Sequence, residues 1–367
     1  MWRFASPVAI HWTDDLASLL PSLLPPGQGL LIAHPQFNEA ARAGLLPGSL
    51  AGLPSFSGIE TNPTPDQVQQ AIDFACPLAP RWILAVGGGS VLDTAKIVRL
   101  ALAHDCPSVR ELLQAVPPET GAERPLLIAA PSTHGTGAEL TPWAAIWDMK
   151  SNRKLSLSHP GSYADVAVYC PALTHSLPLP VSISTTLDAL AHAMESLWSR
   201  NGNPVSVELA AAAVGAISEN LELLADPVPH PVRENLLRAS LLAGLAFANT
   251  RTAAAHSISY PLTLHLGIPH GIACTLTLPA LWRINSPDMP IQAERLRRQL
   301  GHEDVAAVLE RMLRFAAKSL PIRLSAYGAK PADLDSLARE SFTKGRMDNN
   351  LVDLSLADVR AILESIF

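Results

Sequence analysis

Proline is distributed unevenly along this 367-residue chain, since 21 of its 32 prolines lie in residues 1–180. Because proline is restricted to turns, loops and first helical turns, we expect short connections in the first half and long helices in the second. Short apolar runs followed by turn residues predict buried parallel strands at Leu30–Ala33, Trp82–Val86, Leu126–Ala130 and Val166–Tyr169. Helices are expected between them, over Pro65–Cys76 and Val91–His104. This alternation is typical of an α/β domain.

The residues after Val181 show helical spacing and are rich in alanine and leucine. Long helices are predicted over Ser182–Arg200, Val205–Leu224, Glu234–Thr250 and Gly271–Ile284, and further ones over 290–320, 331–344 and 356–367. The expected fold is therefore an α/β dinucleotide-binding domain, residues 1–178, followed by an all-helical domain, residues 179–367.

Composition excludes several classes of protein. Hydrophobic residues make up 48% and charged residues 16%, which excludes a disordered chain. A net charge of −6 argues against nucleic acid or an anionic membrane as a partner. No uncharged apolar run is long enough to cross a bilayer, and the start of the chain does not resemble a signal peptide. The four cysteines are dispersed without a CxxC pair, so we expect a cytoplasmic protein in a reducing compartment.

Two glycine-rich segments each follow a predicted strand. The first, GGGSVLDTAK from Gly87 to Lys96, opens a helix, where free N–H groups and the helix dipole suit a diphosphate. The second, PSTHGTGAELT from Pro131 to Thr141, has the small residues of a loop pressed against a sugar or phosphate. The alternative for each segment is a tight turn without a ligand. Two such loops after strands of one sheet favour a nucleotide site.

The helical half contains a cluster of potential metal ligands. Asp188 and His192 stand four residues apart on one helix face, and His256 and His270 follow in a neighbouring apolar region. One carboxylate with three imidazoles suits Fe(II) or Zn(II) better than Mg(II) or Ca(II). The alternative is that these are capping, core or surface residues. The spacing of His265 does not match, which leaves it as a supporting or surface residue.

The motifs GGGSVLDTAK, STHGTGAELT and LDALAHAME, together with His256 and the His270 of PHG, resemble the iron-containing (group III) alcohol dehydrogenases. The resemblance covers roughly residues 25–285 in the same order and spacing. It implies metal-dependent oxidation or reduction with NADH or NADPH, in a cleft between the two domains, and commonly a homodimer. By residue match it implies the catalytic metal ligands Asp188, His192, His256 and His270. It implies a coenzyme site at Gly88, Gly89, Ser90, Asp93, Ser132, Thr133 and Lys154.

A narrower resemblance is carried by GTGAELTPWAAIWD, KLSLSHPGSYADVAV, ESLWSRNGNPVS and ANTRTAAAHSISYPLTLHLGIPHG. These segments are similar to the phosphonate-metabolism subgroup, the phosphonoacetaldehyde reductases, which implies reduction of phosphonoacetaldehyde to 2-hydroxyethylphosphonate. We expect one helix to carry Arg251 and Thr252 a turn before His256, and we predict that Arg251, Thr252 and Arg200 hold the phosphonate.

Two departures from the family pattern affect the predicted chemistry. Tyr260 stands where many relatives have a histidine, so the proton donor is Tyr260, water or the coenzyme ribose. His34 stands where NAD-preferring relatives often have an aspartate, so we expect NADPH to be accepted at least as well as NADH. Rival functions are an alcohol dehydrogenase for another small alcohol or aldehyde, a lyase or cyclase that uses its coenzyme transiently, and a non-catalytic binding protein.

Overall fold

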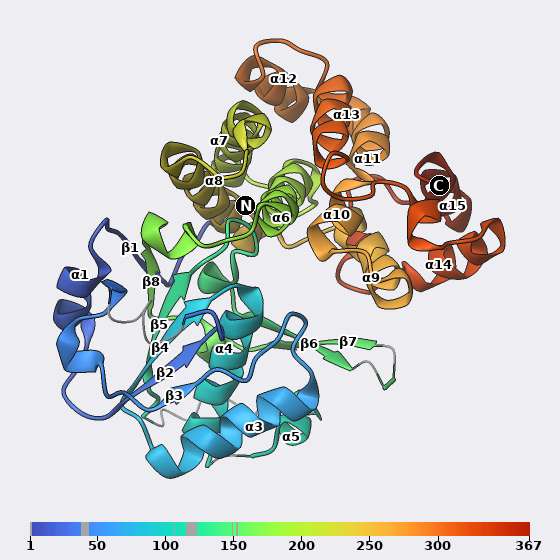
Figure 1. The fold of residues 1–367 in the computed structure, drawn as a ribbon. Coiled ribbons are helices and arrows are strands. Elements are labelled where there is room, and N and C mark those ends of the chain that lie inside the picture. The colour runs from blue at the N-terminus through green and yellow to red at the C-terminus, as the bar shows by residue number, and fades with distance from the viewer. Residues whose placement is uncertain (1, 38–43, 106, 115–122, 149, 152) are drawn as a thin grey trace. The chain divides into compact units, whose positions relative to one another are not determined.

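The chain forms two compact units in a computed structural model that describes residues 2–37, 44–105, 107–114, 123–148, 150–151 and 153–367 (Figure 1). The sheet unit comprises Ser6–Thr133 and Ala138–His175. The helical unit comprises Ser176–Phe367 together with Met1–Ala5 and His134–Gly137. The chain therefore changes unit three residues earlier than the expected start at 179. Within the second glycine-rich segment, His134–Gly137 is part of the helical unit.

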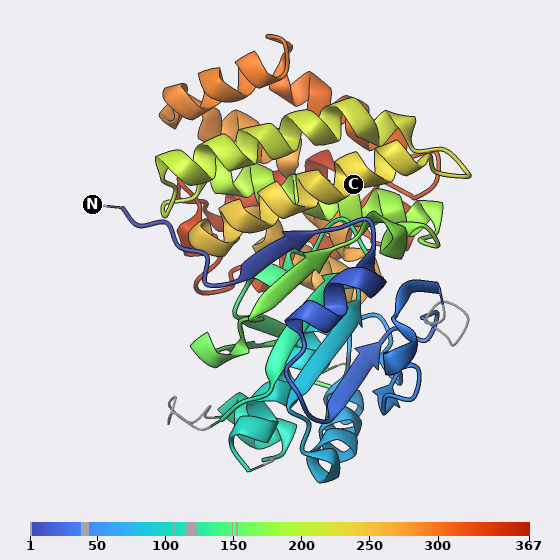
Figure 2. The ribbon, with the colours of Figure 1, turned by 90° about the vertical axis from the view of Figure 1, so that its left-hand side faces the viewer.

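Six parallel strands form the core of the sheet unit and lie side by side in the order β1-β8-β5-β4-β2-β3 (Figures 1 and 2). Their bounds are β1 Ala9–Trp12, β2 Gly29–Ala33, β3 Ser55–Phe56, β4 Trp82–Gly87, β5 Leu126–Pro131 and β8 Val166–Tyr169. The central strands β2 and β4 are buried along their whole length, which explains why they are continuous apolar runs in the sequence. The four strands predicted from the sequence are β2, β4, β5 and β8.

Helices connect the strands of the sheet unit. They are α1 Leu16–Leu23, α3 Pro65–Ala75, α4 Gly89–Ala103 and α5 Val109–Gln114. The start of α3 is fixed by a capping box, in which Thr64 and Gln67 bond each other's backbone, with Pro65 in the first turn. An antiparallel hairpin of β6 Trp143–Asp148 and β7 Arg153–Ser158 was not predicted. Its strands mix apolar with polar residues and lack a short turn signal.

The helical unit contains ten α-helices within the described residues. They are α6 Leu179–Trp198, α7 Pro204–Asn220, α8 His230–Thr250, α9 Ala254–Leu266, α10 His270–Thr275, α11 Leu278–Asn285, α12 Pro290–Gln299, α13 Val305–Ala316, α14 Leu334–Glu340 and α15 Leu356–Ser365. The predicted helices over Gly271–Ile284 and 290–320 are each two helices. The expected continuous helix through Arg251 is also wrong, because α8 ends at Thr250 and α9 begins at Ala254.

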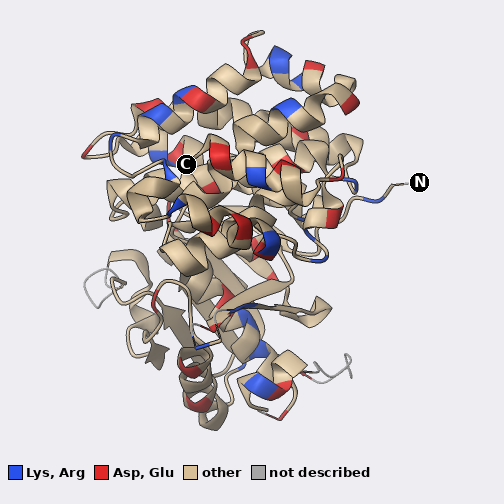
Figure 3. Cartoon of the chain, turned by 90° about the vertical axis from the view of Figure 1, so that its right-hand side faces the viewer, with Lys and Arg blue, Asp and Glu red and all other residues tan. Residues whose placement is uncertain are grey.

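The core of the helical unit is built from small apolar residues. Along α7, Ala210, Ala211, Ala213 and Val214 are all fully buried, as expected for a helix inside a bundle. Figure 3 shows basic and acidic residues interspersed on the helices of the face drawn. One ion pair of this unit joins Arg298 and Glu294 on α12. Within the described part of the chain, no helix combines the length and hydropathy that a bilayer crossing requires.

The cysteines depart from the sequence argument. Cys76 is disulfide-bonded, while Cys170 and Cys274 are free and buried. The compartment in which the protein works stays a prediction.

Candidate metal and coenzyme sites

Three of the predicted coenzyme residues, Gly88, Ser132 and Thr133, lie together at the carboxyl ends of β4 and β5. Gly87 pairs with Pro131 at the end of this ladder, and Ser132 donates its backbone N–H to Gly87 O at 2.9 Å. A Cβ at Gly87 would lie 2.6 Å from Val91, and one at Gly88 would lie 3.1 Å from Thr133 Cγ2. Glycine is therefore required at Gly87 for the strand to turn directly into α4.

The start of α4 is suited to an anion. Gly88 is its N-cap residue and provides no side-chain hydrogen bond, so the first-turn N–H groups are not capped by it. Ser90 lies in this first turn and its Oγ accepts the backbone N–H of Asn62 at 3.2 Å. Thr133 Oγ1 is buried and has no hydrogen-bond partner among the described residues. These features fit the diphosphate of a dinucleotide.

Asp93 and Lys154 have identifiable contacts within the protein. The carboxylate of Asp93 accepts from Lys96 Nζ at 3.1 Å and from Ala145 N at 2.9 Å, which ties α4 to β6. Lys154 on β7 places its Nζ 5.1 Å from the ring centroid of Trp147. Their predicted roles toward the coenzyme stay predictions.

The candidate metal centre is built on α6 and lies in the helical unit. Asp188, His192 and Glu195 follow one another at helical spacing, and each is at most 5% exposed. His256 lies on α9 and His270 begins α10. The helix α10 packs very close to α6, because a Cβ on Gly271 would lie 1.8 Å from Ser184 O. Thr275 Oγ1 also donates to Leu187 O at 2.9 Å. Only glycine at Gly271 permits this approach.

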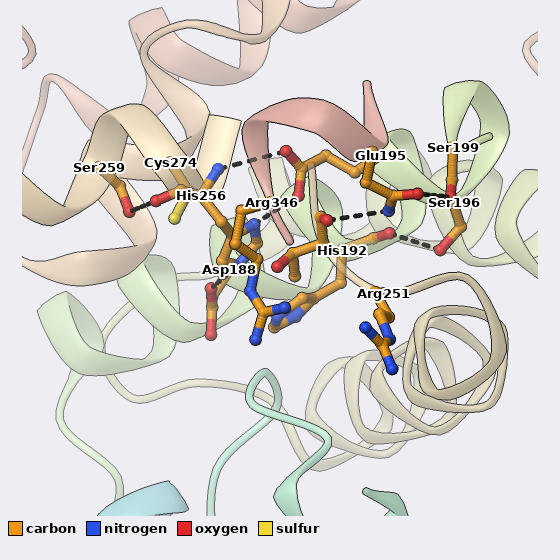
Figure 4. Close-up of polar contacts among 12 residues, drawn as sticks. Asp188, His192, Glu195, Ser196, Ser199, Arg251, His256, Ser259, Cys274 and Arg346 are labelled. Carbon is orange, nitrogen blue, oxygen red and sulfur yellow. Dashed lines mark hydrogen bonds and ion pairs between the residues drawn. The ribbon is translucent and has the colours of Figure 1, made fainter. Parts of the chain in front are cut away.

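Side chains from three helices gather at this centre (Figure 4). One ligand atom each from Asp188, His256, His270 and Cys274 lies within 4.8 Å of all the others. The Asp188 Oδ1 is 3.5 Å from His256 Nε2 and 4.0 Å from His270 Nε2. Asp188 Oδ1 and His256 Nε2 are buried without a hydrogen-bond partner among the described residues. Two buried polar atoms that face one another without a hydrogen bond are expected where a cation binds.

His192 lies beside this group of four. Its ring stacks between Phe247 and His256, with ring centroids 4.0 Å and 4.4 Å apart respectively. Its Nδ1 lies 3.2 Å from Gly135 O. When Nδ1–H donates to that carbonyl, Nε2 is the nitrogen with a free lone pair. Its role as a metal ligand stays a prediction.

Glu195 is a functional residue that sequence reasoning missed. Its Oε2 lies 2.6 Å from His256 Nδ1, and its Oε1 accepts the backbone N–H of His256 at 3.2 Å. A carboxylate at Nδ1 orients a ligating histidine and leaves Nε2 for a metal. Its position, seven residues after Asp188 on the same helix face, was the available signal.

The electrostatics of the site favour a bound cation. Burial lowers the pKa of His192 to about 4, so this ring is neutral at pH 7. Burial raises the pKa of Asp188, but the positive charges that His192, His256 and His270 carry in acid outweigh it and hold that pKa well below its usual value. Burial lowers the pKa of His256, whereas Cys274, Glu195 and Asp188 raise it well above its usual value. A metal bound at His256 Nε2 would replace the proton on this ring, which the neighbouring acidic groups otherwise stabilise.

The three residues predicted to hold a substrate anion have different environments. Arg251 is exposed and lies in the break between α8 and α9 with a φ of 64°, which is rare for a residue with a side chain. Thr252 is buried at 7% exposure. Arg200 is paired with Asp353 at 2.7 Å and donates to Leu351 O. The predicted role of Arg200 toward a substrate anion stays a prediction.

Asn349 fixes the break that carries Arg251. Its Nδ2 donates to Thr250 O at 2.9 Å and to Thr252 O at 3.0 Å, and these carbonyls flank Arg251. Arg346, which was not predicted, lies three residues before Asn349. In the view of Figure 4 its guanidinium extends toward Asp188 and His192. Two arginines therefore project from segments that are cross-linked through one asparagine.

Two further residues were considered in the sequence. His265 is a surface residue whose Nε2 lies 2.6 Å from Glu340 Oε2. Tyr260 stacks on His270, with ring centroids 6.2 Å apart and an interplanar angle of 14°. Its place beside a predicted ligand keeps it among the candidate proton donors.

Comparison with known proteins identifies the class. Residues 27–171 match the family described as iron-containing alcohol dehydrogenase, and residues 182–367 match its C-terminal domain family. The chain therefore belongs to the iron-containing alcohol dehydrogenase family, whose members are oxidoreductases.

Individual relatives narrow the comparison. The chain is 35% identical over 302 residues to a phosphonoacetaldehyde reductase of Streptomyces viridochromogenes, covering 78% of this chain and 76% of the relative. It is 30% identical over 358 residues to a sulfoacetaldehyde reductase of Bilophila wadsworthia, covering 93% and 90%. The solved structure of a sulfoacetaldehyde reductase from Bifidobacterium kashiwanohense with NAD⁺ superposes with a TM-score of 0.89 at 26% identity, covering 100% and 98%.

Proposed function

We propose that this enzyme reduces phosphonoacetaldehyde to 2-hydroxyethylphosphonate, using NADPH or NADH and a divalent metal, Fe(II) or Zn(II). The relatives named for phosphonoacetaldehyde and sulfoacetaldehyde support a two-carbon aldehyde with a terminal oxyanion. The observation that carries the proposal is the pair Arg251 and Arg346, on segments cross-linked by Asn349. Strained backbone at an exposed arginine is retained where it serves a function.

Different residues of the chain bind the metal, orient a metal ligand and bind the substrate. Asp188, His256 and His270, with His192 as predicted, hold the metal. When bound, the metal polarises the aldehyde carbonyl, and the reduced nicotinamide supplies the hydride. Glu195 accepts the Nδ1–H of His256 and fixes its orientation. Arg251 and Arg346 bind the phosphonate and so orient the aldehyde.

The test compares two substrates in matched arginine variants. Arg251→Ala should lower kcat/KM for phosphonoacetaldehyde about tenfold, equivalent to about 1.4 kcal/mol, because a charge-assisted hydrogen bond is lost. Since Arg251 is exposed, this is smaller than the loss expected for a buried arginine. Arg346→Ala should cost more, because that side chain is half-buried.

The control variant is Arg238→Ala, which removes an arginine of α8 that pairs with Glu234 on the surface. It should leave kcat/KM unchanged for both phosphonoacetaldehyde and propanal. Propanal, which has no anionic group, should be reduced at similar rates by all variants. Equal losses for propanal and phosphonoacetaldehyde would remove both arginines from substrate recognition. A higher kcat/KM for sulfoacetaldehyde in the wild type would replace the phosphonate with a sulfonate.

A further inference from the structure

Lys96 ends the first glycine-rich segment and lies in the interior of the sheet unit. It belongs to α4, and its side chain is only 1% exposed although it carries an ammonium group. The Nζ atom donates to Asp93 Oδ1 at 3.1 Å, to Thr141 Oγ1 at 3.4 Å and to Trp143 O at 2.6 Å. An ammonium group has three N–H donors, so Lys96 is fully engaged within the protein.

These contacts join the ends of the two glycine-rich segments. Thr141 is the last residue of the second segment, and Trp143 begins β6 directly after it. The starts of the two segments are joined as well, because Ser132 donates its backbone N–H to Gly87 O at 2.9 Å. The predicted diphosphate-binding turn at the start of α4 therefore lies between two links.

A second buried contact anchors the second glycine-rich segment. Glu139 is 1% exposed, and its Oε1 accepts the hydroxyl of Tyr169 at 2.7 Å. Tyr169 is the fully buried last residue of β8. The segment is therefore held to β8 by Glu139 and to α4 by Lys96, and all of these residues belong to the sheet unit.

A contribution to stability explains the buried Lys96–Asp93 ion pair poorly. Removing an ammonium and a carboxylate from water costs about as much free energy as their attraction returns, and apolar replacements of such pairs are often neutral or stabilising. An apolar side chain of similar length would fill the same space. The bonds from Lys96 to Thr141 and Trp143 are better explained by the geometry that they impose on the two segments.

We propose that Lys96 is a positioning residue for the coenzyme, because its bonds to Thr141 and Trp143 hold the second glycine-rich segment in place against α4. The N–H groups at the start of α4 and Thr133 Oγ1, which is buried without a hydrogen-bond partner among the described residues, then meet one diphosphate without rearrangement. These two parts of the site lie close together, since a Cβ at Gly88 would lie 3.1 Å from Thr133 Cγ2. The inference rests on the coenzyme site of the proposed function and is independent of the metal and the aldehyde.

Titration of coenzyme fluorescence with the full-length enzyme tests this without turnover, using NADH or NADPH, whichever binds more tightly. Lys96→Met keeps most of the length of the side chain and removes its three hydrogen bonds, so the Kd should rise about tenfold. In turnover, the KM for the coenzyme should rise with little change in kcat, because the lost interaction acts on binding.

The matched control is Arg99→Met, which removes another fully buried cation of α4. Arg99 donates to Pro125 O at 3.0 Å and pairs with Asp165, and both partners lie outside the glycine-rich segments. Arg99→Met should therefore keep the wild-type Kd at a temperature where circular dichroism shows it folded, even when it lowers Tm. A rise in Kd equal to that of Lys96→Met would overturn the proposal, since any buried cation of α4 would then have the same effect.

A second comparison separates the bonds to the second segment from the ion pair. Lys96→Met alone leaves the carboxylate of Asp93 without its cation, whereas Lys96→Met combined with Asp93→Asn leaves no unpaired charge. The double variant should bind the coenzyme about tenfold more weakly than Asp93→Asn alone. Equal Kd values in these two proteins would overturn the proposal, because Lys96 would then act only as the counterion of Asp93. A wild type that binds neither NADH nor NADPH would instead overturn the coenzyme site and the proposed function.

Discussion

Acid should destabilise this protein through one buried histidine, His134, which precedes the glycine that bonds His192. Its side chain is fully buried, and neither ring nitrogen has a hydrogen-bond partner among the described residues. Burial, with a smaller effect of the Arg233 charge, lowers its pKa from 6.5 to about 3. Between pH 6.5 and 3 the unfolded chain therefore binds more protons than the folded protein. Stability is fully present above pH 6.5 and is lost as the pH falls through this window.

The magnitude follows from the two pKa values. At pH 5 the unfolded imidazole is almost fully protonated and the folded one is almost fully neutral, which costs about 2 kcal/mol relative to pH 7.5. For a cooperative unit of this size, that corresponds to a fall in Tm of about 4–8 °C. Replacing His134 with leucine should remove this share of the acid effect. Because the imidazole has unsatisfied polar atoms, the substitution should cost little at pH 7.5.

The assay is a series of thermal melts of metal-free protein, with a chelator present, between pH 7.5 and 5.0. Working without metal prevents acid release of the ion from contributing to the result. The wild type and His134→Leu share every other titrating group, so the difference between their two pH-dependent losses in Tm isolates His134. An equal loss of Tm in both proteins would refute the reasoning.

The remaining predictions concern the metal and the coenzyme. Glu195→Gln should weaken Zn(II) binding about 10–100-fold, measured by chelator competition, because His256 loses its charged acceptor, and His192→Ala should weaken it at least as much with circular dichroism unchanged. Wild-type affinity in both variants would contradict the assignment. NADPH should give a kcat/KM at least equal to that with NADH, since no carboxylate at His34 repels the 2′-phosphate. Burial lowers the pKa of His34, so its ring is neutral at pH 7 and adds no attraction, and a clear preference for NADH would show that other residues decide.

The parts of the structure that the sequence predicted are those set by local patterns. The buried strand β4 and the start of α4 follow from one apolar run and the glycines after it. Asp188 and His192 lie on the same face of α6, because residues four apart in a helix project from the same side. Each of these features depends on neighbours a few residues away, so a single segment contains the whole signal.

The features that the sequence did not predict depend on distant partners. The segment around Arg251 consists of residues that tolerate a helix, yet the helix breaks there, because Asn349 bonds the carbonyls on either side. Those partners are separated by 99 and 97 residues in the chain. Glu195 bonds His256 across 61 residues, and Cys274 meets Asp188 only because α10 docks on α6. No local pattern reports such contacts.

The predicted metal ligands and the two arginines of the helical unit differ in how tightly their surroundings are packed. This difference affects which residues can be substituted without disturbing the others. The metal donors lie on helices packed so closely that Gly271 cannot carry a side chain, so a change there would displace Asp188 as well. Arg251 and Arg346 instead project from a helix break and a short connection, which are held by the amide of Asn349. Substituting these arginines removes charge without disturbing the helix contacts that position the metal. Under the proposed function, the same metal centre would serve aldehydes with different end groups, and the segments that carry Arg251 and Arg346 would determine which end group is bound.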